Sequence, residues 1–310
     1  MKSGFALAPL AAVLALAVAG QEPAEGFRQM WIKELKDKRP PARKPAAAGA
    51  VYRPVKPVST GSATAPVTPL KGAEGKRTSP ANSQNDTVLG VTLYRLRKAG
   101  AIDDPNSRLL VIEEESGAQE LVPERVDLDT LLAKGDRVRL SIEVPRAGYL
   151  YVIDRELYVD GTTSEPYLIY PNYLTRPGDN LLAAGRVIEI PDSRDNPNHF
   201  RVRPTRPDTV SELFSILVTP EPLAANLKAG KRPLKLAEET YKEWETKFGV
   251  EAERFVLEGS AGKAWTSQEK LAGAGSAILT QDDALPQTLF KVNYELGKAV
   301  LVRVPVKVRQ

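Results

Sequence analysis

The chain of 310 residues has no cysteine and a single histidine, and both shortages limit its chemistry. Without cysteine it can form no disulfide, no thiolate metal site and no lipid attachment at a cysteine after a leader. Histidine is the commonest base in nucleophilic catalysis, and His199 lies in a polar loop just before an expected strand. A zinc site would have to consist mainly of carboxylates, which is unusual. We therefore predict no catalytic residues, no metal and no cofactor.

Long hydrophobic runs are lacking too, apart from one at the N-terminus. Lys2 precedes an apolar run over 5–18, and Ala17 and Ala19 form the small-x-small pattern that a signal peptidase recognises. The run is shorter than the roughly 20 residues of a membrane span. We predict that residues 1–19 are a cleaved secretory signal, with an uncleaved anchor as the alternative. The mature protein would be periplasmic or secreted, with no transmembrane span.

Positive charge is confined to one part of the chain. The formal net charge is +4, yet residues 28–77 alone carry 12 Lys and Arg against 3 acids, while residues 78–310 carry 30 basic and 34 acidic residues. A nucleic-acid-binding domain would cluster its basic residues on the folded surface. Because they lie in a tail here, we expect no nucleic-acid partner.

The basic segment has the composition of a tether. Residues 39–86 are rich in Pro, Ala, Lys, Ser and Thr and almost free of aromatic residues, so they cannot bury enough apolar area to offset the entropy of ordering. We predict a disordered tether over 20–86, with a short amphipathic helix at 27–38 as a possible exception. The tether could contact an anionic cell-wall polymer or lipid headgroups, or serve only as a spacer.

From about residue 87 the sequence alternates between polar and apolar side chains. The clearest segment is DRVRLSIEV at 136–144, in which one face is apolar and the other carries Arg137, Arg139 and Glu143, the period of a half-buried strand. Many short strands separated by turn residues, without helices between them, predict antiparallel sheets. We expect residues 87–310 to form a single mainly β domain, an immunoglobulin-like antiparallel β-sandwich.

Two helices interrupt this pattern. The segment 234–249 has its apolar residues near one helical face, and Gly249 stands where a helix would end. A second, shorter helix is expected after Thr266 or Ser267.

The C-terminus reads as a hairpin over 289–308. Its last strand places five valines on one face, and we expect it to pair with an early strand and so close the domain. Pro305 cannot donate to a strand ladder, which predicts a sheet edge.

Several short patterns resemble catalytic motifs but lack their partners. SQEK at 267–270 has no accompanying S-D-N or K-T-G, GSAGKA at 259–264 has Ala264 where a phosphate loop needs a hydroxyl, and GAGSAI at 273–278 does not follow a strand. Asp154, Asp160 and Asp179 could together hold calcium, but no D-x-D-x-D-G run supports this.

The blocks GYLYVID at 148–154 and LIYPN at 168–172 stand out among the strands. Tyrosine suits both sheet packing and ligand contact, and taken alone these residues are best explained as structural. As candidate binding positions we select seven residues from these blocks and the segment that follows: Tyr149, Tyr151, Asp154, Tyr170, Asn172, Asp179 and Asn180.

In order along the chain, these blocks resemble a bacterial envelope family catalogued as domain of unknown function 4384. The resemblance rests on Gly135 and Asp136 before an alternating strand, then GYLYVID with its following DG, LIYPN, DNLLAAG at 179–185, and FRV at 200–202. It covers about residues 134–220. Members of this family are typically exported or joined to signalling and peptidase modules. The resemblance therefore implies an accessory or ligand-binding role and brings no catalytic residues.

Three functions remain open. The first is a non-catalytic envelope module that contacts another envelope protein or a cell-wall polymer. The second is a structural component of a secreted complex that offers its last strand for strand addition. The third is a hydrolase whose carboxylates are Asp154, Asp160, Asp179 and Asp195, which would require these to line one concave pocket.

Overall fold

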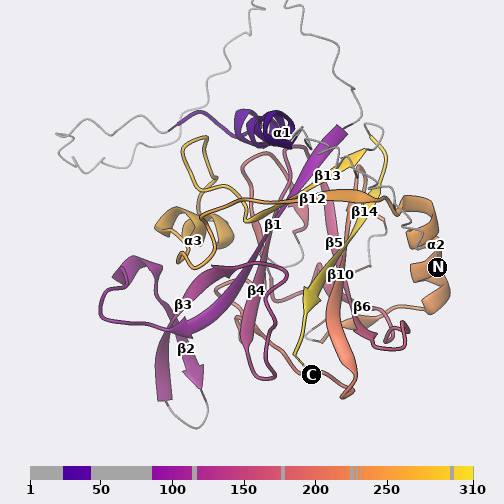
Figure 1. Cartoon of the computed structure of the whole chain (residues 1–310), viewed down its shortest axis with the longest axis horizontal. Helices are drawn as coiled ribbons and strands as arrows, with labels where there is room; N and C mark the ends of the chain where they lie inside the picture. Colours follow the sequence, from indigo (N-terminus) through magenta and orange to yellow (C-terminus); the bar gives the residue numbers. More distant parts are fainter. Residues whose placement is uncertain are drawn as a thin grey trace, which may run out of the picture.

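The computed structural model describes residues 24–42, 86–113, 117–175, 179–223, 227, 230, 232–293 and 297–309. The predicted signal at 1–19 and most of the predicted tether lie outside these residues. The described chain is mainly β, with two antiparallel sheets packed as a sandwich, which confirms the predicted fold class (Figure 1). No helix among the described residues is long and apolar enough to cross a membrane.

The first sheet, here called sheet I, has eight strands among the described residues. Its central path follows the order β12-β13-β1-β3-β2, and β4 joins it by pairing with β1, β8 and β9. The strands are β1 (Asp86–Lys98), β2 (Leu109–Glu113), β3 (Gly117–Val126), β4 (Arg137–Glu143), β8 (Ile188–Ile190), β9 (Phe200–Arg201), β12 (Ala252–Val256) and β13 (Thr288–Asn293).

The second sheet, sheet II, has six strands in the described chain. Their order is β11-β6-β5-β10-β14, and β7 pairs with β5. The strands are β5 (Gly148–Tyr158), β6 (Tyr167–Tyr170), β7 (Leu181–Leu182), β10 (Thr209–Thr219), β11 (Leu234–Lys235) and β14 (Val300–Lys307). A short 3-10 helix, Pro105–Ser107, and three α-helices complete the described elements: α1 (Ala24–Lys38), α2 (Glu238–Phe248) and α3 (Ser267–Gly273).

Alternation along the strands produces the core between the sheets. On β4 the apolar face predicted from the sequence points inward, and Val138, Leu140 and Ile142 are buried against residues of sheet II such as Val152 and Ile216. Burial of a large aliphatic side chain stabilises the fold by about 1.5–3 kcal/mol, so this layer supplies the main driving force for folding.

The C-terminal strands differ from the predicted hairpin. β13 pairs with β1 and β12 in sheet I, whereas β14 pairs with β10 in sheet II, so the two strands lie in different layers. The early strand therefore pairs with β13, and the last strand with β10. The prediction of an edge at Pro305 is confirmed, because β14 ends the path of sheet II. The local sequence fixes each strand, but not the sheet that it joins.

A helix covers the outer face of sheet II. α2 packs its buried Tyr241 against Tyr151, Ile153 and Leu217, the outward side chains of β5 and β10, and Figure 1 shows it at the side of this sheet. Both faces of β5 are therefore buried. Gly249 caps the C-terminal end of α2, as expected. Its φ of −63° is one that any residue can adopt, so glycine is required here for space: a Cβ would lie 2.3 Å from the Glu245 carbonyl oxygen.

The outer face of β4 was expected to be exposed to solvent, and this expectation is wrong. Arg139 and Glu143 are 0% and 2% exposed, because α3 and the segment after α1 cover them. The Arg39 guanidinium makes two bonds of 2.7 Å to the Glu143 carboxylate and donates to the carbonyls of Asp283 and Ala284. Residues 24–42, part of the predicted tether, thus pack on the domain.

Candidate functional site

The site arises where the inward positions of two neighbouring strands change from aliphatic to acidic. On β5, Leu150 and Val152 belong to the core, and Asp154 and Glu156 continue the same face toward the end of the sheet. β10 runs antiparallel beside it, with Phe214 opposite Asp154 and Glu212 opposite Glu156. Like charges directly opposite each other are unfavourable in a sheet, so this arrangement does not serve stability.

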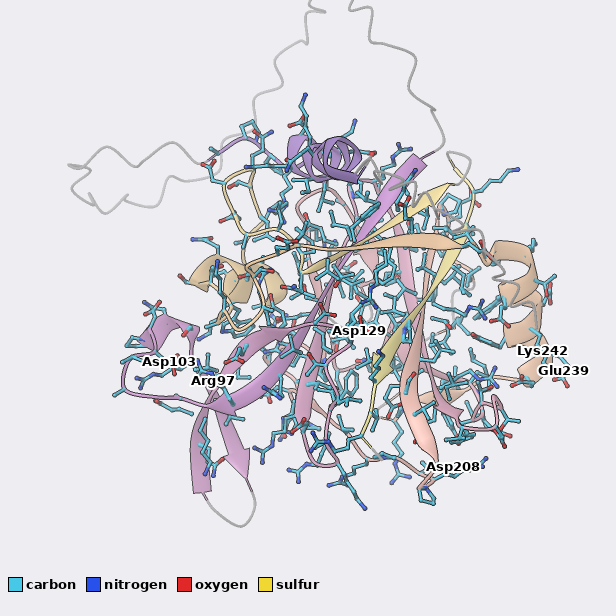
Figure 2. All side chains as sticks on the ribbon, viewed as in Figure 1. Arg97, Asp103, Asp129, Asp208, Glu239 and Lys242 are labelled. Carbon is cyan, nitrogen blue, oxygen red and sulfur yellow. The ribbon has the colours of Figure 1, made fainter. Side chains whose placement is uncertain are left out.

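A pocket of about 790 Å³ opens at this end of the sandwich. Asp208, labelled in Figure 2 at the lower end of β10, marks the position, because its ion-pair partner Arg206 lines the pocket. The apolar part of the lining comes from both sheets, with Val138, Phe200 and Val202 on one side and Ile169 and Phe214 on the other. The pocket is therefore a continuation of the space between the sheets.

Two carboxyl groups in this pocket have raised pKa values. Burial, followed by the charge of Glu156, raises the pKa of Asp154 to about 7. Burial, followed by the charges of Asp154 and Glu156, raises the pKa of Glu212 to about 8. Asp154 Oδ1 is sheltered from solvent and has no hydrogen-bond partner among the described residues, although the residue as a whole is only half-buried.

Glu156 is held differently. Its carboxylate accepts hydrogen bonds from the Thr205 backbone N–H at 2.9 Å, from the Thr205 hydroxyl at 2.7 Å and from the Thr209 hydroxyl at 2.9 Å. These donors fix the position of the Glu156 carboxylate beside the other two acids. Glu156 therefore lies next to two carboxyl groups whose pKa values are raised.

Arginines surround the mouth of the pocket. Arg201, Arg203 and Arg232 are exposed, and no ion pair involves them in the part of the chain that the structure describes. Arg155, by contrast, is occupied by Glu238 at 3.0 Å and by the Tyr241 ring at 4.8 Å from its centroid. The pocket therefore has acids inside, free guanidinium groups outside and apolar walls between them.

Of the seven predicted binding residues, only Asp154 lines this pocket. Tyr149 is half-buried beside the α2 cluster, and the hydroxyl of the buried Tyr151 accepts the Leu223 backbone N–H at 2.9 Å. The hydroxyl of the buried Tyr170 donates to the Asp179 carbonyl at 2.6 Å. These tyrosines pack and position loops.

The predicted asparagines also form hydrogen bonds with backbone groups of the fold. Asn172 accepts the N–H groups of Leu174 and Thr175 and donates to the Ile169 carbonyl, which closes the turn after β6. Asn180 donates to the Leu150 carbonyl at 2.9 Å, and the Asp179 carboxylate forms an ion pair with Arg186. Their hydrogen-bonding capacity is used within the fold.

The structure also separates the four acids of the hydrolase hypothesis. Asp160 closes the turn after β5 by accepting the Thr162 N–H at 2.9 Å, and Asp195 accepts from the Thr175 hydroxyl. Neither these two nor Asp179 lines the pocket that contains Asp154. The two acids that accompany Asp154 on β5 and β10, Glu156 and Glu212, were missed. The alternation of side chains along the strand could have revealed Glu212, because it lies on the same face of β10 as the core residues Phe214 and Ile216.

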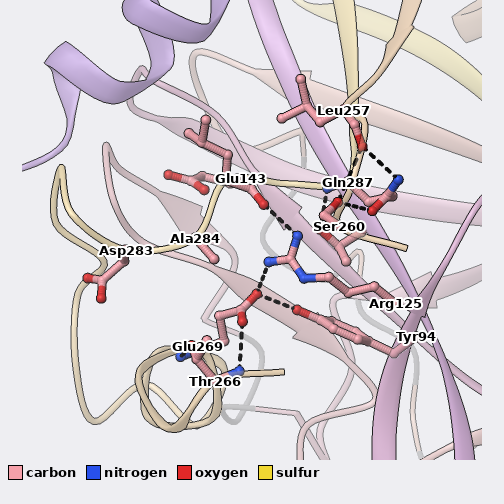
Figure 3. A network of polar contacts seen from close by, with 12 residues as sticks. Tyr94, Arg125, Glu143, Leu257, Ser260, Thr266, Glu269, Asp283, Ala284 and Gln287 are labelled. Atoms are coloured by element: carbon pink, nitrogen blue, oxygen red, sulfur yellow. Dashed lines mark hydrogen bonds and ion pairs between the residues drawn. The ribbon is translucent and has the colours of Figure 1, made fainter. Parts of the chain in front are cut away.

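A second polar cluster lies on the outer face of sheet I. Figure 3 shows the Glu269 carboxylate receiving hydrogen bonds from the Tyr94 hydroxyl, the Arg125 guanidinium and the Thr266 backbone N–H. The Thr266 hydroxyl accepts the Glu269 N–H in return, which forms a capping box at the start of α3. The adjacent space is only about 10 Å³. This cluster fastens α3 to the sheet and leaves no room for a ligand.

The residues that the structure describes contain no candidate metal site. No group of three or more His, Asp or Glu side chains there is arranged to hold an ion. His199, expected in a surface loop, is almost buried, and burial together with the charge of Arg137 lowers its pKa to about 4. The neutral imidazole contacts Asn198 at 3.2 Å.

A family model matches the part of the chain that contributes most of this pocket. Residues 131–222 match the model of a domain of unknown function, DUF4384, which confirms the resemblance seen in the sequence. No curated protein and no solved structure matches the chain. The matched segment runs from just before β4 through β10, so it contributes both acidic strands, Arg201 of β9 and the following Arg203, whereas Arg232 lies outside it.

Proposed function

We propose that this protein is an exported accessory module of the bacterial envelope that binds a ligand in the pocket between its sheets without transforming it. The observation that carries the proposal is the pocket of about 790 Å³, in which one oxygen of Asp154 has no hydrogen-bond partner among the described residues. Its volume falls within the range of about 300–1,000 Å³ that is typical of small-molecule sites. Mainly apolar walls with a few convergent polar groups are also typical of such sites.

A hydrolase is the weaker alternative for the same pocket. Carboxyl pairs that cleave glycosides need environments that push their pKa values apart, so that one group is protonated while the other is ionised. Here burial raises both, the pKa of Asp154 to about 7 and that of Glu212 to about 8. Asp154 and Glu212 thus lack this asymmetry, and the other three carboxylates of the hydrolase hypothesis do not line the pocket; both observations support binding over catalysis.

Strand addition at β14 is also less well supported. β14 lies at the edge of sheet II, but the backbone of Val250 donates to Leu301 and that of Leu132 donates to Lys307. Pro305 removes a further donor from the strand itself. Neighbouring segments thus protect both ends of this edge, which leaves little backbone for a partner strand.

Export and the basic segment belong to the same proposal. The pattern in residues 1–19 supports secretion into the periplasm or beyond, and protein recovered from the periplasm should lack these residues when its intact mass is measured. Residues 43–85 carry seven Lys and Arg against one acid, which supports contact with an anionic cell-wall polymer or an acidic envelope protein. Replacing these seven by Gln should weaken retention on isolated cell walls.

Ligand capture tests the pocket. Purified protein is incubated with a low-molecular-mass envelope extract and washed, and the released compounds are identified by mass spectrometry. Thr163→Trp places a large ring in the lining, and Thr130→Trp is the matched control, because Thr130 is also half-buried but does not line the pocket. We expect the wild type and Thr130→Trp to enrich the same unchanged compound, and Thr163→Trp to lose it.

Three results would overturn the proposal. One is that no compound is enriched, and another is that Thr163→Trp enriches it equally well. The third is that the extract returns a hydrolysed product in place of the captured compound, which would favour the hydrolase.

A further inference from the structure

The distribution of charge in the pocket identifies the class of ligand. We infer that the pocket binds a small zwitterion, with the ammonium group against Asp154 and Glu212 and the carboxylate at the arginines of the mouth. This inference rests on the proposed binding function and adds the chemistry of the ligand. Free amino acids and short peptides are the simplest molecules with this pair of groups.

The inner half of the pocket holds acidic side chains, and no described residue supplies them with a cation. Asp154 and Glu212 have no basic partner among the described residues, and the nearby Arg155 is occupied by Glu238 and by the Ser164 carbonyl. Glu156 adds a third carboxylate, which is fixed by threonines that carry no charge. An ammonium group placed here would supply a donor to the unpartnered Oδ1 of Asp154 and offset the repulsion among the acids.

In the outer half, guanidinium groups outnumber carboxylates among the described lining residues, and the exposed Glu165 there is already paired with Lys235. Arg201, Arg203 and Arg232 line the pocket, are exposed, and have no acidic partner in the described chain. Guanidinium groups bind carboxylates through two parallel hydrogen bonds, so they suit the second charge of the ligand. Between the two halves, Ile169 and Phe214 offer apolar surface for its carbon chain.

The depth of the two charge types sets the orientation. The acids are half-buried or buried on the strands, whereas the three arginines are exposed. A purely anionic ligand would meet the acids at the inner end, and a simple diamine would meet the arginines at the mouth. Only a molecule with a positive group leading and a negative group trailing matches both halves.

The charged groups around Asp154 determine how binding depends on pH. They come from β5, β10, the segment from β9 to residue 206 and the loops at the mouth: Arg155, Glu156, Glu212, Arg201, Arg203, Arg206, Glu165 and Arg232. An ammonium ligand favours the ionised carboxyl groups, so binding should release protons near pH 7. The affinity should therefore rise with pH through about 7 to 8.

Titration calorimetry with defined probes tests this inference. The probe is Nα-acetyl-lysine, whose side-chain ammonium stays charged up to about pH 10 and whose carboxylate is free. Nα,Nε-diacetyl-lysine lacks the ammonium, and Nα-acetyl-lysine amide lacks the carboxylate. We expect the probe to bind, each analogue to bind at least tenfold more weakly, and the affinity for the probe to be higher at pH 8.5 than at pH 6.

Two variants locate the effect. Asp154→Asn with Glu212→Gln removes the titrating pair while keeping its shape, and it should lower affinity at least tenfold and abolish the pH dependence. Glu239→Gln is the charge-matched control, since Glu239 is exposed on α2 and is labelled there in Figure 2. It should bind as the wild type does. Circular dichroism of each variant establishes that the sheets are intact.

The outcomes separate this inference from the proposed function. If the diacetylated analogue binds as well as the probe, or if affinity falls as pH rises, the protonated acids act as donors and the zwitterion is wrong. The zwitterion is also wrong if extract capture enriches a neutral or purely anionic compound. The proposed binding function would then still stand. If neither the extract nor any probe yields a bound ligand, both proposals fail.

Discussion

Replacing Arg39 by alanine should destabilise the whole domain, although this residue lies in the segment that the sequence predicts to be a tether. The Arg39 guanidinium is buried and makes a bidentate pair with Glu143 on β4, with both bonds at 2.7 Å. It also donates to the carbonyls of Asp283 and Ala284 in the loop before β13. One side chain therefore joins three separate parts of the chain.

The magnitude follows from the burial of the partner. Glu143 is 2% exposed, so removal of Arg39 leaves a carboxylate without its cation in the protein interior. Loss of one member of a buried ion pair costs about 3–5 kcal/mol, whereas an exposed pair is worth only about 0–1 kcal/mol. For a domain of this size, about 1 kcal/mol corresponds to roughly 2–4 °C in Tm. We expect Arg39→Ala to lower Tm by about 6–20 °C.

Denaturant unfolding followed by circular dichroism measures this change as a free energy. Lys38→Ala is the matched control, because Lys38 is a neighbouring exposed base and should change stability by less than about 0.5 kcal/mol. Arg39→Met combined with Glu143→Leu should recover much of the loss, since an apolar pair of similar volume can replace a buried ion pair. A loss below about 1 kcal/mol for Arg39→Ala would refute the reasoning.

Three further perturbations follow from single contacts. Gly249→Ala should destabilise the protein by more than about 1 kcal/mol in thermal unfolding, because its Cβ would lie 2.3 Å from the Glu245 carbonyl oxygen; unchanged stability would show that this helix end can shift. Tyr241→Phe should cost about 1–3 kcal/mol, because it leaves the buried Ser215 hydroxyl, now 2.8 Å from the Tyr241 oxygen, without that partner, and an equal Tm would contradict this. The raised pKa of Asp154 means that the native state retains a proton that the unfolded chain loses above about pH 4, so this residue lowers stability as pH rises from about 4 to 7. Asp154→Asn should therefore stabilise the protein at pH 8 by about 1–2 kcal/mol and not at pH 3.5, and a gain of equal size at both values would exclude titration as the cause.

Local patterns predicted the elements of this fold but not the pairing among them. The alternation at 136–144 correctly placed Val138 and Leu140 in the core, because period 2 follows from backbone geometry alone. The split of 288–307 between two sheets could not be read locally, since β13 and β14 have similar apolar faces and the choice depends on distant partners. Pairing across a long sequence separation is a property of the whole chain.

The outer face of sheet I shows a second limit. Arg139 and Glu143 have the residue types of a solvated face, and only their partners, Glu189 and Arg39, reveal that this face is covered. Those partners lie 50 and 104 residues away in the sequence. A charged strand face can therefore be exposed to solvent or covered by other charged residues, and the sequence of a single strand does not distinguish the two.

The candidate site was located only in part for a related reason. Tyrosine and asparagine drew attention to 148–172 because their side chains suit ligand contact, yet most of them satisfy backbone groups inside the fold. Glu212 was overlooked because SELFSILV reads as an ordinary strand. Parity along β10 places Glu212 on the core face, and an acid at a core position is the more informative signal.

The contrast between the two buried polar regions supports a functional origin for the pocket. On the outer face of sheet I, Arg39, Arg125 and Arg139 each meet a carboxylate, so folding compensates the charges that it buries. At the end of the sandwich, Asp154 and Glu212 meet no basic side chain in the described part of the protein, and burial raises both of their pKa values. A chain that needed only a core would have continued the aliphatic positions of β5 and β10. Uncompensated acids that face a cavity are what a site for a positively charged group requires before its ligand arrives.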